Sequence, residues 1–220
     1  MIKTQSKQGY EIRGVECQEQ DDRYILTWKY QKGTHFLIFL SAAEKKLNPE
    51  DEWKEMSEQN FQAFMESGEY RTDRFLMLLV EEPGISSAGK KYDLLKSDAD
   101  SYLPGKIRIF SCTEDVDRLS VYRSLEELSS LYLPVWVKIH TSYRKICFTR
   151  RKKCYFQVDP FREYKEGMVC YRVREDGGIF PLTQQCLGKK LLVVMPRNLM
   201  LKVFISEEYA KCYRIHEVAL

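Results

Sequence analysis

The sequence has no long apolar run and no apolar segment near its start. Runs such as FLIFL (36–40), FLMLLV (75–80) and LLVVM (191–195) fall far short of the roughly 18 residues that a membrane-spanning helix needs. The opening residues, MIKTQSKQGYEIRG, lack the apolar core of a secretion signal. We therefore expect a cytoplasmic protein without a membrane partner.

Short pairs of metal ligands are also missing. The chain has 7 cysteines and 3 histidines but no C-x2-C or H-x3-H pair, and most structural zinc sites start from such pairs. The cysteines stand at positions 17, 112, 147, 154, 170, 186 and 212. An odd number of scattered cysteines without a secretion signal indicates reduced thiols. We expect no metal and no cofactor.

The sequence lacks the common catalytic and nucleotide-binding motifs. It contains no G-x-S-x-G, no G-x-G-x-x-G and no P-loop. Its paired carboxylates cluster at a helix start and in loops, which a solvated surface explains better than a glycosidase site. A nucleophilic pair of Cys147 or Cys212 with His140 or His216 is an alternative that no signature supports. The sequence thus predicts a protein that is not an enzyme.

The charges are unevenly divided along the chain. Residues 1–128 carry 18 Lys and Arg against 24 Asp and Glu, a net charge of −6. Residues 129–220 carry 17 against 8, a net charge of +9. With 220 residues in all, this division predicts an acidic first domain, 1–128, and a basic second domain, 129–220. The basic half is either attracted to the acidic half or binds an anionic partner.

Most of the chain alternates apolar and polar residues as β-strands do, and aromatic residues make up 13% of it. Residues 24–30 and 35–40 predict two strands joined by a hairpin turn at 31–33. The stretch 135–159, VWVKIHTSYRKICFTRRKKCYFQVD, predicts three strands with turns at 141–143 and 150–153. The segment 81–102 is predicted to be largely loop, with a short strand at 92–95.

One amphipathic helix is predicted at about 49–66. Asn48 is a good N-cap, Pro49 suits the first helical position, and Gly68 suits the C-cap. Apolar residues then recur at helical spacing and form a single stripe, which favours packing against a core over ligand binding. These residues are Trp53, Met56, Phe61, Phe64 and Met65.

The strand rhythm of the first half resembles that of fibronectin type III and immunoglobulin-like modules. The segments RYILTWKY, THFLIFLS, KYDLL and GKIRIFSC correspond to the B, C, E and F strands of such modules. The inserted helix departs from the pattern, and so does the absence of a proline-rich first strand. The resemblance implies two β-sandwich units that bind or scaffold, and it transfers no site residues.

A basic hairpin at 143–155 is the best candidate binding site. Its cations could hold an anionic partner while neighbouring aromatic rings stack on bases or sugars, although charged hairpin tips also serve solubility alone. The candidate residues are Arg144, Lys145, Arg150, Arg151, Lys152, Lys153, Tyr155 and Trp136.

The sequence therefore predicts a mainly β, non-enzymatic protein that interacts with or scaffolds another protein. A carbohydrate-binding module is one alternative, and it requires Trp136 and Tyr155 in a row on one sheet. Binding of an anionic polymer such as nucleic acid through the hairpin 143–155 is the other. The oligomeric state is left open.

Overall fold

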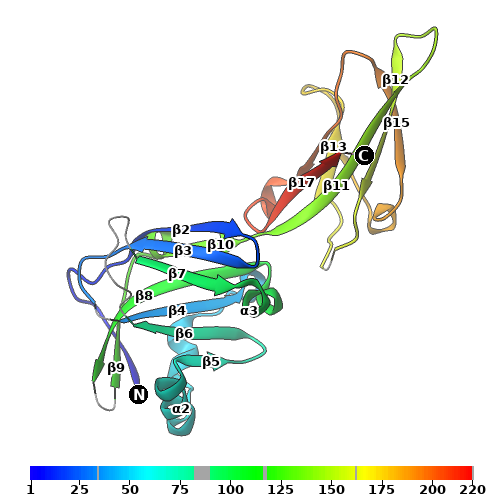
Figure 1. The fold of residues 1–220 in the computed structure, drawn as a ribbon. Coiled ribbons are helices and arrows are strands. Elements are labelled where there is room, and N and C mark those ends of the chain that lie inside the picture. Colours follow the sequence, from blue (N-terminus) through cyan, green and yellow to red (C-terminus); the bar gives the residue numbers. More distant parts are fainter. Residues whose placement is uncertain (34, 82–89, 116–117, 162, 220) are drawn as a thin grey trace. The chain divides into compact units, whose positions relative to one another are not determined.

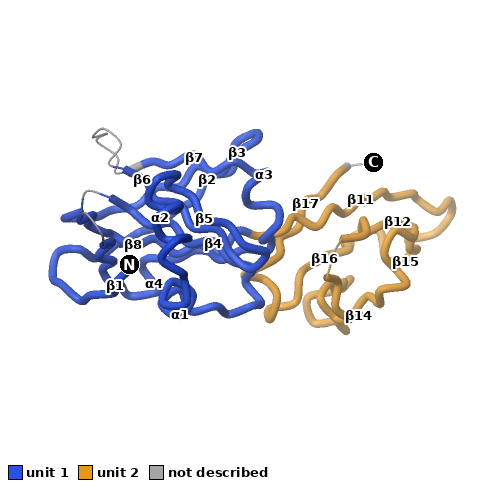
Figure 2. Tube along the Cα trace, turned by 90° about the horizontal axis from the view of Figure 1, so that it is seen from below, with its two compact units in different colours: residues 1–133 blue, residues 134–220 orange. Residues whose placement is uncertain are grey.

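The computed structural model describes residues 1–33, 35–81, 90–115, 118–161 and 163–219. The protein is mainly β, as the sequence predicted. The chain forms two compact units, Met1–Leu133 and Pro134–Leu220 (Figure 2), whereas the sequence predicted a division after residue 128. Among the described residues, no helix has the length and apolar character needed to cross a bilayer.

A seven-stranded sheet forms the centre of the first unit (Figure 1). Its order is β1-β9-β8-β4-β6-β5, and β10 pairs with a further part of β8. The strands are β1 (Ile2–Gln5), β4 (His35–Ala42), β5 (Glu69–Arg71), β6 (Phe75–Glu81), β8 (Gly105–Asp115), β9 (Arg118–Tyr122) and β10 (Ser130–Leu133).

Strand β4 is nearly all apolar because both of its faces are buried. Phe36, Ile38 and Leu40 point into one core cluster, together with Trp28. Leu37 and Phe39 point into a second cluster on the other side of the sheet. A strand that is covered on both faces loses the usual alternation of apolar and polar residues, as β4 does.

A three-stranded sheet covers the first of these clusters. It has the order β2-β3-β7 and consists of β2 (Arg13–Gln20), β3 (Arg23–Lys29) and β7 (Lys90–Leu95). Residues 82–89 of the loop predicted at 81–102 lie outside the described residues. The remainder of that segment forms β7 and a short helix, α3 (Lys96–Ala99), followed by one turn of 3-10 helix.

The predicted hairpin between residues 24–30 and 35–40 is wrong, because β3 and β4 belong to different sheets. The turn between them is held by the side chain of Ser111, whose hydroxyl donates to the carbonyl of Lys32 at 2.8 Å. Gly33 is required here, because its φ is 129° and a Cβ would lie 2.0 Å from the Ser111 hydroxyl oxygen. The turn therefore carries the chain from one layer to the next.

The helical segment covers the opposite face of the large sheet (Figure 1), but the prediction of one helix at 49–66 is wrong. It consists of α1 (Pro49–Lys54) and α2 (Glu58–Ser67). Ser57 interrupts the helix because its side chain accepts a hydrogen bond from the backbone of Asn60 and caps a new start. A last short helix, α4 (Glu126–Ser129), precedes β10.

The second unit has a four-stranded and a three-stranded sheet, which enclose a separate apolar cluster. The first has the order β15-β12-β11-β17 and contains β11 (Val135–Lys145), β12 (Arg151–Val158), β15 (Leu191–Pro196) and β17 (Tyr213–Ala219). The second has the order β14-β13-β16 and contains β13 (Val169–Arg172), β14 (Phe180–Pro181) and β16 (Lys202–Ile205).

The prediction of three strands in 135–159 is wrong, because the stretch forms a single long hairpin of β11 and β12. Thr141 and Tyr143 sit within the β11 ladder, opposite Phe156 and Cys154, so no turn occurs there. β-Branched and aromatic side chains suit such positions. Of the four consecutive cations, only Arg150 lies in the turn, since β12 already begins at Arg151.

Phe36 provides a test of the first unit. Its ring lies 5.3 Å from that of Trp28 and 4.8 Å from that of Tyr30, measured between centroids. Phe36→Ala should lower the free energy of unfolding of this unit by about 3–5 kcal/mol, because it leaves a cavity where two layers meet. Denaturant titration measures the change. Leu125→Ala, at a side chain that is 71% exposed, should change stability by less than about 0.5 kcal/mol. Equal losses of stability in the two variants would contradict the placement of Phe36 between the two sheets.

Candidate functional site

The predicted site residues divide between the two faces of the β11–β12 hairpin. Side chains alternate along a strand, and the buried residues Val137, Ile139 and Phe156 identify the inner face. By this alternation Lys145 and Lys152 lie on the inner side, near the tip. Arg150 lies in the turn. The outer face carries the rest of the predicted set, namely Trp136, Arg144, Arg151, Lys153 and Tyr155.

The hairpin places cations directly opposite each other. Arg144 is the cross-strand partner of Lys153, and Lys145 is the partner of Lys152. Like charges at such positions are destabilising. In the part of the chain that the structure describes, no ion pair joins a carboxylate to Arg144, Lys145 or any of residues 150–153. The repulsion is therefore not neutralised by nearby acidic side chains.

Three aromatic rings of the β11–β12 hairpin already contact cations of the protein. The Lys152 ammonium lies 4.6 Å from the centroid of the Tyr143 ring, and that of Lys190 lies 5.0 Å from the Tyr155 ring. The guanidinium of Arg214 lies 6.0 Å from the ring of Trp136. These are cation–π distances. One face of each ring is thus occupied, which reduces the surface open to a sugar or a base.

Strand β15 adds an apolar strip to the outer face, which the sequence did not predict as part of the site. Leu192 pairs with Tyr155 and Val194 pairs with Lys153. Their side chains are 50% and 48% exposed, whereas those of Leu191, Val193 and Met195 pack on the core. The signal was present in the run LLVVM: a strand covered on one face only must expose every second residue.

Arg197 holds the hairpin tip in place and was also not predicted. Its backbone N–H donates to the carbonyl of Arg150 at 2.9 Å. Its guanidinium donates to the carbonyls of Ile146 at 2.7 Å and of Arg151 at 3.4 Å. The turn after β15 therefore braces the tip, where Phe148 adopts a φ of 59° and is fully exposed.

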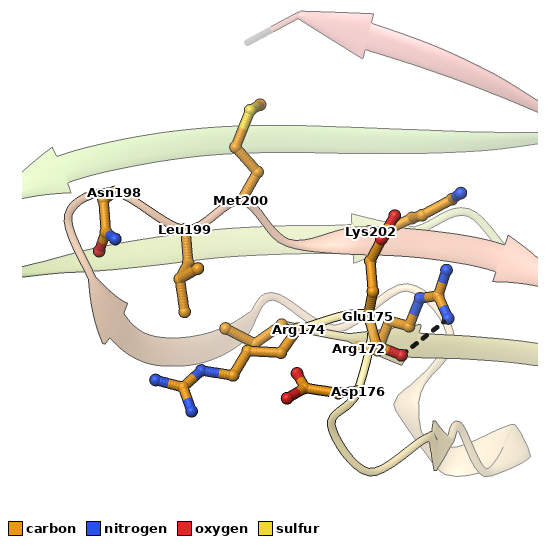
Figure 3. A pocket seen from close by; sticks show the side chains of 9 residues that line it. Arg172, Arg174, Glu175, Asp176, Asn198, Leu199, Met200 and Lys202 are labelled. Carbon is orange, nitrogen blue, oxygen red and sulfur yellow. Dashed lines mark hydrogen bonds between the residues drawn. The ribbon is translucent and has the colours of Figure 1, made fainter.

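A shallow cavity of about 430 Å³ lies elsewhere in this unit (Figure 3). Its lining includes Arg172, Arg174 and Lys202, together with two acidic residues. Figure 3 shows the guanidinium of Arg174 and the ammonium of Lys202 on different sides of the cavity. Arg172 donates to the backbone carbonyl of Glu175 at 3.5 Å. Arg172 and Lys202 are cross-strand partners, whereas Arg174 lies on the other side, so the three cations do not converge on one point.

A larger groove, of about 1020 Å³, lies in the first unit beside α1 and α2. Its walls include Met56, Phe61 and Met65 from the stripe that was predicted to pack on the core. Trp53 also lines it, and no hydrogen-bond partner is found for its buried indole N–H in the described structure. Charged side chains of both signs line it as well, among them Lys3, Glu58 and Arg118, so the groove does not select one class of ligand.

The thiol and imidazole groups do not assemble into a catalytic or metal site in the described ranges. His140 is paired with Asp159, Nε2 to Oδ2 at 3.1 Å, and no cluster of three potential metal ligands occurs among the described residues. None of the seven cysteines forms a disulfide. Burial raises the pKa of Cys154, whereas a hydrogen bond from the Thr183 hydroxyl lowers that of Cys186.

Arg197→Ala tests the brace at the hairpin tip. Because the guanidinium bonds to Ile146 and Arg151 are lost while the backbone bond to Arg150 remains, local opening should become easier by about 1 kcal/mol. Hydrogen exchange at the amides of Ile146 and Arg151 should accelerate accordingly. Lys211→Ala, which removes a positive charge near the other end of β11, where Tyr213 pairs with Val135, should leave both rates unchanged. Equal rates in the Arg197 variant and the native protein would contradict the brace.

Comparison with known proteins adds no family to this description: no family model matches the chain, and no curated protein matches it.

Proposed function

We propose that this is a non-enzymatic protein-interaction or scaffolding protein. In this proposal the outer face of the β15-β12-β11-β17 sheet binds an acidic surface of a partner protein. The observation that carries the proposal is the pair of opposed cations Arg144 and Lys153, which have no ion-pair partner among the described residues.

The opposed cations cost stability in the free protein. A like-charge pair on a sheet is unfavourable by a few tenths of a kcal/mol up to about 1 kcal/mol. A carboxylate placed between Arg144 and Lys153 converts this repulsion into attraction to both groups. The net charge of +9 on residues 129–220 also speeds the approach of an acidic partner.

The apolar strip favours a protein over the other anionic partners. Leu192 and Val194 lie beside the cations and provide a patch that a partner can bury. Protein interfaces combine such an apolar centre with a polar and charged rim. Carbohydrate binding is less well supported, because cations already cover one face of the rings of Trp136 and Tyr155.

An anionic polymer remains the second candidate, favoured by the cations on both faces of the hairpin tip. Lys145 and Lys152 lie on the inner side of the tip, whereas Arg144 and Lys153 lie on the outer face. A flexible polyanion can contact both sides, and its affinity then falls steeply with salt.

The finer architecture is part of the proposal. Each unit consists of two sheets around an apolar cluster, which supports an immunoglobulin- or fibronectin-like β-sandwich in each. A cytoplasmic location is likewise proposed, and it is supported by seven cysteines that form no disulfide.

A pair of double variants tests the outer face. Arg144→Gln with Lys153→Gln removes two charges from the outer face, and Lys145→Gln with Lys152→Gln removes two from the inner side. The outer variant should elute from immobilised polyglutamate at clearly lower salt than the inner variant, because only it loses the facing cations. Elution of both variants at the same salt concentration would contradict a binding site on the outer face. Equal weakening on heparin would then favour the polymer.

A further inference from the structure

Strand β15 is an edge strand with one side unpaired. It ends the strand order of its sheet and pairs with β12 only. No other strand in the described ranges pairs with its far side. An edge strand presents a row of N–H and C=O groups that can pair with another chain, and natural proteins usually block such edges with charge, proline or a bulge.

The register identifies the backbone groups on that free side. Arg197 donates its N–H to the carbonyl of Arg150, the residue opposite it. In an antiparallel ladder, alternate residues turn both backbone groups toward the partner strand, and the residues between them turn both groups away. Counting back from Arg197, the residues that face β12 are Met195, Val193 and Leu191. Leu192 and Val194 therefore direct N–H and C=O outward.

These two residues also expose their side chains on the outer face. Leu192 and Val194 thus combine free backbone groups with half-exposed apolar side chains, without a charge between them. Pro196 is the next residue on the outward side, and it has no N–H to donate. An added strand can therefore pair over Leu192 and Val194, and its ladder loses a hydrogen bond at Pro196.

The charges around β15 indicate which strand fits. Lys189 and Lys190 precede the strand and Arg197 follows it. The Lys190 ammonium lies over the Tyr155 ring and the Arg197 guanidinium bonds to carbonyls of the hairpin tip, and both keep their positive charge close to the strand ends. If two copies of β15 paired antiparallel about Val193, Lys189 of each would lie opposite Arg197 of the other. Like charges at both ends disfavour this self-pairing. A segment with apolar residues in its middle and acidic residues at its ends would instead match the apolar side chains of Leu192 and Val194 and the cations at the two ends of β15.

We propose that the partner protein donates an extended, acid-flanked segment that adds to the sheet along the free edge of β15. This inference rests on the proposed function, since it specifies how the partner binds to that sheet. Backbone hydrogen bonds at Leu192 and Val194 provide the pairing, and the flanking cations select the charge of the segment.

The test uses the full chain and a labelled synthetic peptide with alternating Val and Thr in the middle and two Glu at each end. Fluorescence anisotropy should show binding, and the same peptide with Lys in place of Glu should not bind. On binding, hydrogen exchange at the amides of Leu192 and Val194 should slow. The amides of Leu191 and Val193, which already face β12, should change little.

Val194→Pro removes one outward N–H without breaking the β12 ladder, since proline is tolerated where the N–H of an edge strand faces solvent. It should weaken peptide binding about tenfold, because a backbone hydrogen bond is lost. Val194→Thr keeps the N–H and the β-branched shape and should bind nearly as the native protein does. A peptide N-methylated at its central Val should also bind about tenfold more weakly, which tests the pairing without altering the protein.

The outcomes separate this inference from the proposed function. If Val194→Pro and the N-methylated peptide bind normally while the outer-face glutamine variant binds weakly, the partner contacts the face and strand addition is overturned. If the native protein does not bind the peptide at millimolar concentration, strand addition is overturned as well. The proposed function fails only if the variant Arg144→Gln with Lys153→Gln is also retained on polyglutamate as strongly as the native protein.

Discussion

The register between β11 and β12 is the constraint on which the candidate binding surface depends. It sets Arg144 against Lys153 and Lys145 against Lys152, and it determines which of these pairs lies on the outer face. A shift by one residue would exchange the two faces of a strand and bury its charges. Burial of Cys154, Phe156 and Val158 on the inner face prevents this shift. The apolar core therefore also determines on which face each cation lies.

The same register places β15 beside the charged residues. Because β12 is the neighbour of both β11 and β15, Leu192 and Val194 come to lie next to Tyr155 and Lys153. Arg197, just beyond β15, then binds back to the hairpin tip. The apolar strip, the cations and the free strand edge thus belong to one sheet.

The cations of the β11–β12 hairpin differ from several cations of the first unit in whether they form ion pairs. In the first unit, Arg123 forms a two-pronged pair with Glu50 at 2.7 and 2.8 Å, which lowers the pKa of that carboxyl, and Arg74 pairs with Glu52 at 2.7 Å. Such exposed pairs add little stability, but they neutralise the surface locally. The hairpin of the second unit has no comparable pair among the described residues, which is why we assign its cations to a partner.

The sequence by itself determined the class of the fold and the inward and outward faces of individual strands. The alternation of Val137, Ile139 and Phe156 with polar neighbours reports burial directly, because side-chain direction in a strand is a local property. The apolar character of β4 likewise reported a strand covered on both sides.

Only the tertiary structure decided which strands pair and which cations share a face. The turn at Gly33 looked like a hairpin, yet it joins two layers because Ser111, distant in sequence, holds it. The division of the predicted helix at Ser57 is by contrast a local effect, because the side chain of Ser57 accepts from the backbone of Asn60, three residues away, and the apolar periodicity does not report it. The free edge of β15 and the brace at Arg197 also arise from contacts between residues far apart in the chain, on which local patterns carry no information.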